Sequence, residues 1–409
     1  MKILLVLLVL LFPLGAHAAT INASACTPAA VTTAIAAASA GDTVQLPTCT
    51  TTTWNAQVTV AKAVHIKGTG TTTTNLRKSV TAPFFRFDSG SPSSPLTDFS
   101  LCCMTLEGIT HGIAPLFEQA SNDHGVYLSN GVDFRVYDMT FQYMSIALSV
   151  FGNPQVQRGV IYNNTFFHNV RYSSTSGGYG VEVRGNSTYP TLELGTTQNV
   201  FIEDNYFEEN RHGVESANGS RYVARYNTFV NHREDTTAID AHGNTGAFGP
   251  SGRGSRQWEV YNNLITNAIV RFGGIGMRGG DGTIFNNVIT NLGREVVLWN
   301  EDFGTGGGCD CTYPCADQTR EAYIWNNTPS TIFFKGDPGS CHRDIIELDR
   351  DYFAIARPGY TLHETGLPNF PTGKTSVYPL SAVYPHPLRE DPPIFPPNPP
   401  AIFHVTPIP

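Results

Sequence analysis

A short pattern of apolar and polar residues recurs through the middle of the chain. In each copy a strand of aliphatic or aromatic residues runs into asparagine, followed by a small or β-branched residue and then an apolar one, as at residues 162–166. The register residues of the copies are Asp138, Asn164, Asn205, Asn227, Asn263, Asn287 and Asn327. They lie 22 to 41 residues apart, and the longer spacings contain turn-rich insertions. This repeat predicts a solenoid in which each coil packs on its neighbours.

Asparagine has a physical reason to occupy this position in a stack of coils. It tolerates the left-handed backbone geometry of a tight turn, and stacked asparagine side chains can hydrogen-bond along the axis. The pattern resembles the asparagine ladder of pectate-lyase-like proteins over roughly residues 64–329. The resemblance implies an all-β fold, a right-handed parallel β-helix solenoid of about eight or nine coils.

The two ends of the chain also resemble parts of secreted β-helix proteins. Residues 25–44 and 64–68 resemble the helix and first strands of an N-terminal cap. Residues 351–360 and 384–388 resemble the closing block of bacterial right-handed β-helix proteins of unassigned activity, a likeness that implies a fold and no chemistry. The expected units are an N-terminal helical cap at 19–63, the parallel β-helix at 64–350 and an extended, Pro-rich C-terminal segment at 351–409.

Residues 1–18 have the composition of a secretory signal peptide. Lys2 precedes an apolar run, and Ala16-His17-Ala18 supplies a small-x-small cleavage site. The apolar run is too short to span a bilayer, and no later stretch reaches about 18 uninterrupted apolar residues. We therefore expect a secreted protein, extracellular or periplasmic, without a membrane segment.

The eight cysteines favour disulfides in an exported chain. Cys26 and Cys49 flank a short helical stretch and a strand, so we expect them to pair. A second group follows or lies in a Gly-rich loop and comprises Cys309, Cys311, Cys315 and Cys341. We expect disulfides within this group rather than a zinc site, because paired CxxC spacings are absent. Cys102 and Cys103 are adjacent and would point to opposite faces of a strand, so we expect no bond between them.

The charge of the chain bears on its partners. The formal net charge is −8, with 26 lysines and arginines against 34 acidic residues and no basic block. A nucleic-acid or anionic-membrane partner is therefore not expected. We expect a monomer whose partner is a polysaccharide, with local arginine clusters that bind acidic sugars.

A second strand of each coil can be aligned once the asparagine register is set. Its second and fourth positions are apolar or small and form a core-facing column, so the third and fifth positions face outward. The charged outward residues are Glu182, Arg184, Glu215, Asp240, His242 and Arg278. Adjacent coils lie about 4.8 Å apart, so the carboxylates should form a column beside the cations. We expect the functional centre there.

Turns and insertions around this strand supply further candidates for substrate binding. The candidates at the rim are His232, Arg233, Arg253, Arg256 and Arg271, which join Glu182 and Arg184. The insertion after Trp299 adds Glu301 and the cysteine loop. Loops beside a polar strand face are typical of a substrate cleft, although they also fit a second interpretation in which they only shield an edge of the solenoid.

Carboxylates at the spacing of adjacent coils repel one another unless a cation, a neighbouring arginine or a raised pKa offsets the charge. A calcium ion held by Glu182, Glu215 and Asp240 would meet this need, although the pattern does not require a cofactor. The alternative is a solvated strand face with incidental ion pairs.

Three functions are compatible with these residues. The favoured one is a polysaccharide lyase acting on a uronic-acid-containing polysaccharide by β-elimination, with His242 as base and Arg278 or Arg256 neutralising the uronate. The second is a glycoside hydrolase that uses two of Glu182, Glu215 and Asp240, although the chain lacks the Asn-Thr-Asp, Asp-Asp and Gly-His-Gly set of polygalacturonases. The third is a non-catalytic glycan-binding or structural β-helix protein.

Overall fold

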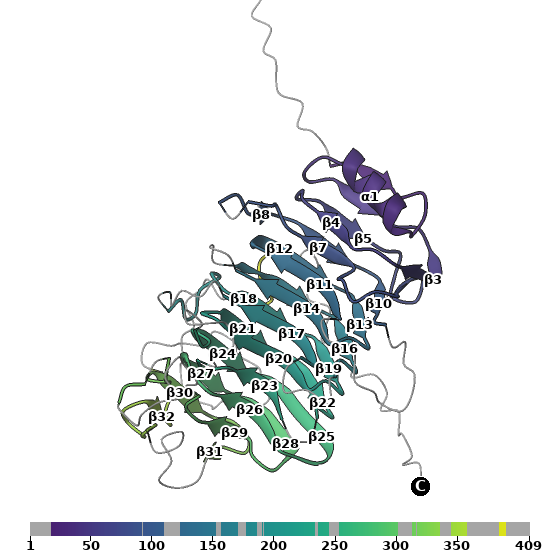
Figure 1. The fold of residues 1–409 in the computed structure, drawn as a ribbon. Helices are drawn as coiled ribbons and strands as arrows, with labels where there is room; N and C mark the ends of the chain where they lie inside the picture. The colour runs from purple at the N-terminus through teal and green to yellow at the C-terminus, as the bar shows by residue number, and fades with distance from the viewer. Residues whose placement is uncertain are drawn as a thin grey trace, which may run out of the picture.

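The computed structural model shows a stack of parallel strands (Figure 1). The structure describes residues 18–91, 93–109, 123–152, 157–170, 177–185, 190, 192–233, 236–244, 253–301, 313–315, 317–335, 345–357 and 384–389. Within these residues the chain visits three parallel sheets in a constant order, so that one visit to each sheet makes one coil. The fold is a right-handed parallel β-helix, as the repeat predicted.

Between residues 49 and 298 each coil contributes to all three sheets, whereas, among the described residues, the last coil has no strand in sheet B. Sheet A consists of β1 (Thr20–Asn22), β2 (Thr43–Gln45), β5 (His65–Lys67), β9 (Ser100–Cys102), β12 (Gly131–Tyr137), β15 (Arg158–Tyr162), β18 (Val200–Glu203), β21 (Arg221–Arg225), β24 (Gln257–Tyr261), β27 (Asp281–Phe285), β30 (Ala322–Trp325) and β32 (Tyr352–Phe353), with β8 (Leu96–Thr97) beside β12. Sheet B consists of β3 (Cys49–Trp54), β6 (Thr74–Lys78), β10 (Thr105–Glu107), β13 (Thr140–Gln142), β16 (Thr165–Phe167), β19 (Tyr206–Glu208), β22 (Thr228–Val230), β25 (Leu264–Arg271) and β28 (Val288–Leu292). Sheet C consists of β4 (Val58–Val60), β7 (Phe85–Phe87), β11 (His124–Ser129), β14 (Ile146–Phe151), β17 (Tyr179–Arg184), β20 (His212–Ala217), β23 (Thr237–Ala241), β26 (Gly273–Met277), β29 (Val296–Leu298) and β31 (Ile332–Phe334).

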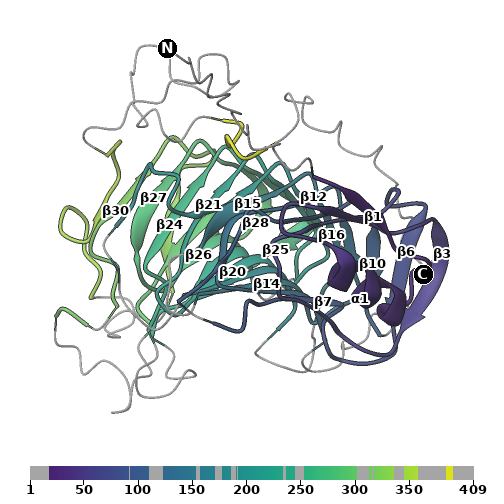
Figure 2. The ribbon, with the colours of Figure 1, turned by 90° about the horizontal axis from the view of Figure 1, so that it is seen from above.

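The core lies inside the three sheets, which surround it when the molecule is seen from above (Figure 2). Residues at the same position of successive coils stack, so like side chains meet. In sheet B the rings of Phe141, Phe166, Phe207 and Phe229 follow one another with centroids 5.0, 4.7 and 4.6 Å apart. The outward positions of the strands are therefore equally regular.

A short helix, α1 (Pro28–Ala37), packs against β1, β2 and β4 at the N-terminal end of the stack (Figure 1). Proline at the first helical position and the Thr27 hydroxyl, which accepts the Ala30 N–H, start the helix. The expected disulfide between Cys26 and Cys49 is present. The helical cap is confirmed.

The register asparagines stack in one buried column. Its members are Asn164, Asn205, Asn227, Asn263, Asn287 and Asn327, each at most 6% exposed. The side-chain amide of each donates to the side-chain oxygen of the next over 2.8–3.0 Å. The same oxygen accepts the backbone N–H of the preceding asparagine over 3.0–3.1 Å. These bonds set the register between coils.

The left-handed residue of each turn directly precedes the stacked asparagine. These residues are Asn163, Asp204, Tyr226, Asn262, Asn286 and Asn326, with φ between 52° and 57°. Asp138 has the same geometry, with φ of 50°, and pairing of Thr140 with Thr165 places it level with Asn163. The sequence register is therefore wrong by one residue at Asp138, and Met139 occupies the stacked position of that coil.

The expectation that Cys102 and Cys103 do not bond is wrong. The two form a disulfide, because Cys103 has a left-handed backbone with φ of 68° and does not continue the strand alternation. Cys315 is also disulfide-bonded. Cys309, Cys311 and Cys341 lie outside the described residues, so pairing within their group stays a prediction.

The solenoid begins earlier than residue 64, since β2, β3 and β4 already occupy the three sheets. Near the other end of the chain, residues 384–389 pack on the outer face of sheet A. There Arg389 forms ion pairs with Glu203, at 3.1 Å, and with Asp204, and the Tyr384 hydroxyl donates to Asp204 at 2.8 Å. Residues 384–389 of the expected C-terminal segment are thus docked on the solenoid, whereas the start of that segment supplies β32 and so extends the solenoid beyond residue 350.

Among the described residues no helix is long and apolar enough to cross a membrane.

The asparagine column generates a stability prediction. Asn227→Ala removes an oxygen that accepts two hydrogen bonds from Asn205 and an amide that donates to Asn263. Because buried polar groups are left without partners, the free energy of unfolding in urea should fall by about 2 to 4 kcal/mol. Asn55→Ala, at an exposed position, is the control and should change it by less than about 0.5 kcal/mol. Equal effects of the two substitutions would contradict a stabilising role of the column.

Candidate functional site

The outward face of sheet C carries the charged column that the sequence predicted. Strands β17, β20 and β23 pair so that Glu182 lies beside Glu215 and Glu215 beside Asp240. The alternate positions of these strands are buried in the core. The sequence alignment is correct for these strands but lacks the coil of β14, whose Ser149 lies beside Glu182.

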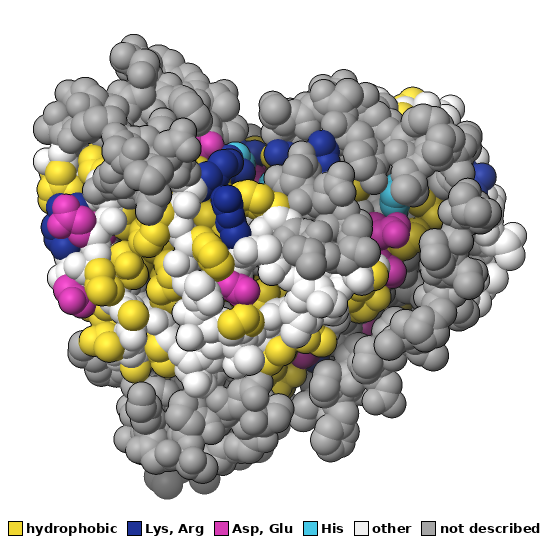
Figure 3. All heavy atoms as spheres, turned by 90° about the horizontal axis from the view of Figure 1, so that it is seen from below, with side chains coloured by type: hydrophobic (Ala, Val, Ile, Leu, Met, Phe, Trp, Pro, Cys, Tyr) yellow, Lys and Arg dark blue, Asp and Glu magenta, His cyan; other side chains and the backbone are white. Residues whose placement is uncertain are grey.

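The side chains of this column point away from the core and yet are buried. Glu182 is 3% exposed, and Glu215 and Asp240 are not exposed at all. The side chains of His242 and Arg278 keep 13% and 15% of their surface exposed. The alternative of a solvated strand face is therefore wrong, and each buried charge depends on its partners. Figure 3 views the molecule from the C-terminal end of the stack and shows Lys, Arg and His side chains in a recess of that face.

His242 is the contact point of three carboxylates. Its Nδ1 atom lies 3.0 Å from Glu301 Oε2, and its Nε2 atom lies 3.3 Å from Glu215 Oε1 and 3.5 Å from Asp240 Oδ2. Arg278 joins the same group, with ion pairs of 2.7 Å to Asp240 and 2.8 Å to Glu301. Glu301, which the sequence placed only in a wall of the groove, is thus a central member of the cluster.

Arg184 holds the other end of the cluster. Its guanidinium donates to Glu182 Oε1 over 2.7 and 3.0 Å and lies 3.2 Å from Glu215 Oε1. The second oxygen of Glu182 accepts the Ser149 hydroxyl at 3.0 Å, and Ser149 in turn contacts His124 Nδ1 at 3.0 Å. A continuous line of polar contacts therefore runs from β11 to Glu301. We call Glu182, Arg184, Glu215, Asp240, His242, Arg278 and Glu301 the charge cluster.

The cluster separates the pKa values of its carboxyl groups. Burial raises the pKa of Glu215 to about 7, against the lowering effect of Arg184 and His242. Burial also tends to raise the pKa of Asp240. The Arg278 guanidinium, together with His212 and His242, outweighs this effect and holds the pKa of that carboxyl well below its usual range. The same guanidinium keeps the pKa of Glu301 at about 2 despite burial. Below a pH of about 7 the Glu215 carboxyl is therefore mainly protonated, while Asp240 and Glu301 are ionised.

A second outward row, one step earlier on the strands, was not aligned from the sequence. Tyr179 and His212 pair across β17 and β20, and Arg211 donates to the Tyr179 hydroxyl over 3.3 Å. His212 Nδ1 donates to the Thr237 carbonyl at 2.6 Å, and its buried Nε2 atom has no hydrogen-bond partner among the residues that the structure describes. Burial lowers the pKa of His212 well below its usual value. The sequence could have revealed this row. Tyr179 and His212 are the first residues of β17 and β20, whereas the sequence alignment began one residue later in each strand.

The expected rim residues do not all join the cluster. Arg253 forms an ion pair with Asp317, and Arg256 binds Asp281 at 2.7 Å and the Pro190 carbonyl at 2.6 Å. Arg256 is therefore engaged at the start of β27 in sheet A and not beside His242. His232 is buried and Arg233 is half-buried in the turn before β23, and the side chain of Arg271 lies outside the described residues.

The predicted carboxylate column does not have the arrangement of a metal site. Within the described part of the chain, no group of three or more His, Cys, Asp and Glu side chains is placed to hold a metal ion. Arg184 and Arg278 occupy the positions between the carboxylates instead. Arginine therefore offsets the repulsion for which calcium was one of the options.

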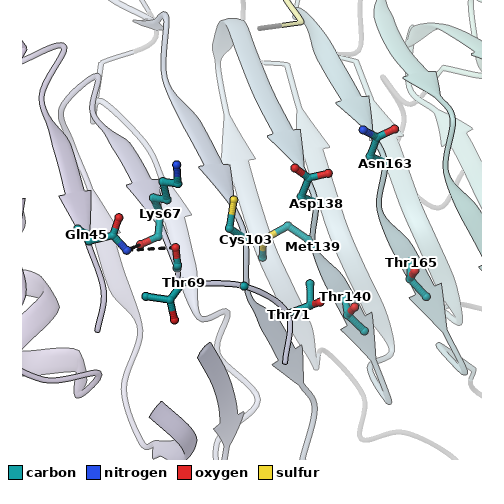
Figure 4. A pocket seen from close by; sticks show the side chains of 12 residues that line it. Gln45, Lys67, Thr69, Thr71, Cys103, Asp138, Met139, Thr140, Asn163 and Thr165 are labelled. Atoms are coloured by element: carbon teal, nitrogen blue, oxygen red, sulfur yellow. Dashed lines mark hydrogen bonds between the residues drawn. The ribbon is translucent and has the colours of Figure 1, made fainter. Parts of the chain in front are cut away.

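An open groove of about 630 Å³ lies elsewhere, at the turns between sheets A and B (Figure 4). It is lined by Gln45, by residues 67–71 and by residues at the corresponding turns of the following coils, namely Cys103, 138–140, Asn163 and Thr165. Figure 4 shows Lys67, Cys103, Asp138 and Asn163 pointing to one side of it. No pattern in the sequence indicated this groove, which is separate from the charge cluster on sheet C.

Burial changes the stability expected of one substitution. If His242 were an exposed surface residue, its replacement by alanine would lower the free energy of unfolding by less than about 0.5 kcal/mol. In the structure its ring contacts Glu215, Asp240 and Glu301. Without the ring, these three buried carboxyl groups would lose a shared partner. We therefore expect His242→Ala to cost about 1 to 3 kcal/mol, measured by urea unfolding.

The raised pKa of Glu215 generates a pH prediction. The folded protein keeps this proton up to pH about 7, whereas the unfolded chain loses it near 4.5, so its stabilising contribution declines between these values. The free energy of unfolding of the wild type, relative to Glu215→Gln, should fall by up to about 1.4 kcal/mol per pH unit in this window. Glu259, whose pKa burial raises to about 8, contributes to both proteins and cancels. A difference that stays constant from pH 5 to pH 7 would contradict the assignment.

No protein-family model matches this chain, and no curated protein matches it in sequence. Among solved structures it is similar to ORF18 of Geobacillus virus E2, with a TM-score of 0.38, 16% identity, and coverage of 70% of this chain and 58% of that chain. It is also similar to the surface adhesin PfbA of Streptococcus pneumoniae, with a TM-score of 0.44, 14% identity, and coverage of 73% of this chain and 82% of that chain. A third similar structure is the catalytic unit of the GH87 alpha-1,3-glucanase of Streptomyces thermodiastaticus, with a TM-score of 0.39, 13% identity, and coverage of 78% of this chain and 68% of that chain. This chain spans less than two thirds of the length of ORF18, and the likeness to all three concerns the fold alone.

Proposed function

We propose that this chain is a carbohydrate-active enzyme that hydrolyses a glycosidic bond of a polysaccharide at the charge cluster. Glu215 is the general acid and Asp240 the ionised carboxylate. One observation carries the proposal, namely that these two carboxyl groups lie side by side in adjacent coils, both in contact with His242 Nε2. Their surroundings support it, because burial raises the pKa of Glu215 while the Arg278 guanidinium lowers that of Asp240. One protonated and one ionised carboxyl group are what glycoside hydrolysis needs.

The spacing of neighbouring coils, about 4.8 Å, is close to the carboxyl separation of about 5 Å in retaining enzymes. In that mechanism the Glu215 proton moves to the glycosidic oxygen as the bond from the anomeric carbon to that oxygen breaks. The Asp240 carboxylate bonds to the anomeric carbon. Water then replaces Asp240 at that carbon and gives its proton to Glu215, which restores both groups.

The neighbouring side chains have defined tasks in this mechanism. Arg278 keeps Asp240 ionised and ties it to Glu301. His242 contacts both reacting carboxyls, and it and Arg278 retain some exposure, so the substrate approaches from their side. Arg184 limits the charge on the Glu182 side of Glu215.

The β-elimination that the sequence favoured has less support from the geometry. Both ring nitrogens of His242 face carboxylates, so neither is directed at a substrate carbon. Arg278 is engaged by two carboxylates, and Arg256 is bound at sheet A. The base and the uronate-neutralising arginine of a lyase are therefore both occupied.

Activity measurements test the assignment. Glu215→Gln and Asp240→Asn should each lower the rate of release of reducing ends from a cleaved polysaccharide by about 10² to 10⁴-fold, because each removes a proton-transfer or nucleophilic group. Glu208→Gln is the matched control, since Glu208 lies on β19 of the same coil but in sheet B, and should leave the rate unchanged.

The products separate the competing functions. A hydrolase releases reducing ends without unsaturated sugar, whereas a lyase creates a double bond that absorbs in the ultraviolet. Unsaturated products that are lost in His242→Ala but retained in Glu215→Gln would replace the hydrolase assignment by β-elimination. Binding without any product from polygalacturonate, alginate, glycosaminoglycans or neutral glucans would show a glycan-binding protein.

A further inference from the structure

The outward column of sheet C continues past the charge cluster toward the C-terminal end of the stack. β29 pairs with β31, with Leu298 beside Phe334, so the next outward residues, Trp299 and Lys335, are also level. The Lys335 N–H donates to the Leu298 carbonyl at 3.2 Å, which holds it in this register. Lys335 therefore occupies the same column as His242, Arg278 and Trp299, one coil beyond the last member that the sequence alignment contained.

Aromatic rings hold two cations at this end of the column. Lys335 Nζ lies 4.8 Å from the Trp299 ring centroid and 5.8 Å from that of Phe272. The Arg294 guanidinium also lies over the Phe272 ring, 4.8 Å from its centroid. Arg278 contacts Trp299 from the cluster side at 5.1 Å, so the two cations adjoin the charge cluster. Cation–π contacts orient these groups without neutralising their charge.

The arginines of the charge cluster and these two cations differ in their ion pairs. Arg278 binds Asp240 and Glu301, whereas neither Lys335 nor Arg294 makes an ion pair within the part of the chain that the structure describes. Lys335 is exposed and Arg294 is half-buried, so both are accessible from solvent. Two oriented, accessible and unneutralised cations form a place where an anionic group of a ligand gains two favourable interactions.

We propose that Lys335 and Arg294 form a binding subsite for the carboxylate of an acidic sugar unit, supported by the rings of Phe272 and Trp299. The subsite lies three coils from His242, roughly 14 Å along the axis at a spacing of about 4.8 Å per coil. An oligosaccharide lying along the outward face of sheet C would reach both places. The inference rests on the proposed function and narrows its substrate to a polysaccharide that contains uronic acid.

Binding measurements with charge-removing variants test the subsite. Lys335→Met and Arg294→Met keep much of the apolar length of the side chain and remove the charge. Each should raise the Kd for polygalacturonate, measured by affinity electrophoresis, by about five- to tenfold. Neither should alter the migration of the protein in gels that contain neutral dextran.

Lys67→Met is the matched control. Lys67 is exposed and lies at the end of β5, in the groove between sheets A and B, so its loss removes the same charge far from the subsite. Thermal unfolding of all three variants verifies that they fold. An unchanged Kd in both Lys335→Met and Arg294→Met, or an equal rise in Lys67→Met, would overturn the proposal. So would a wild type that binds none of polygalacturonate, alginate and hyaluronan.

The outcomes also separate this subsite from the proposed hydrolysis. If the wild type releases reducing ends and Lys335→Met binds and cleaves polygalacturonate normally, the subsite fails while the hydrolase remains. If Lys335→Met loses affinity but the wild type forms no product, the subsite stands and the hydrolase fails. Sulfated dextran bound as tightly as polygalacturonate would show a general anion site and contradict the preference for a carboxylate.

Discussion

The hydrogen-bonded column of asparagines is the constraint on which the rest of the structure depends. Each side chain from Asn164 to Asn287 donates to the next and so determines which residue of one coil lies above which residue of the following coil. A slip of one residue would turn every outward side chain of a strand into the core. Because equivalent residues of adjacent coils lie level, carboxylates contact one another's neighbours on the outer face of sheet C, and aromatic rings stack on the inner face of sheet B.

The same regularity creates an electrostatic problem that the charge cluster solves. Stacked, buried carboxylates repel one another and lose their hydration, which is costly unless partners are supplied. Arg184 and Arg278 supply them at the two ends, while Glu215, in the middle, takes up a proton instead. The chemistry proposed for the protein is therefore a consequence of how the fold accommodates its own charges. Lys335 and Arg294, which make no ion pair among the described residues, lie next to the charge cluster at the C-terminal end of sheet C.

Much of the architecture was predictable because the repeat carries it. The stacked asparagines, the helical cap, the pairing of Cys26 with Cys49 and the alignment of Glu182, Glu215 and Asp240 all follow from local pattern and strand alternation. The errors arise where alternation breaks or gives no signal. Cys103 and Asp138 have left-handed backbones, and the strand with Ser149 carries no outward charge to mark it. Burial of the cluster and the partners of Arg253 and Arg256 depend on contacts between distant segments, which no spacing in the sequence encodes.

The proposed chemistry requires that Glu215 and Asp240, in adjacent coils, are in opposite protonation states just below pH 7. Carbon-13 NMR of protein labelled at the glutamate and aspartate carboxyl carbons measures this directly, with Glu215→Gln and Asp240→Asn used to assign the signals. We expect one glutamate signal that titrates near pH 7 and is absent from Glu215→Gln, and an Asp240 signal that stays ionised down to the lowest pH at which the protein is folded. A Glu215 signal that titrates at or below pH 4.5 would contradict it.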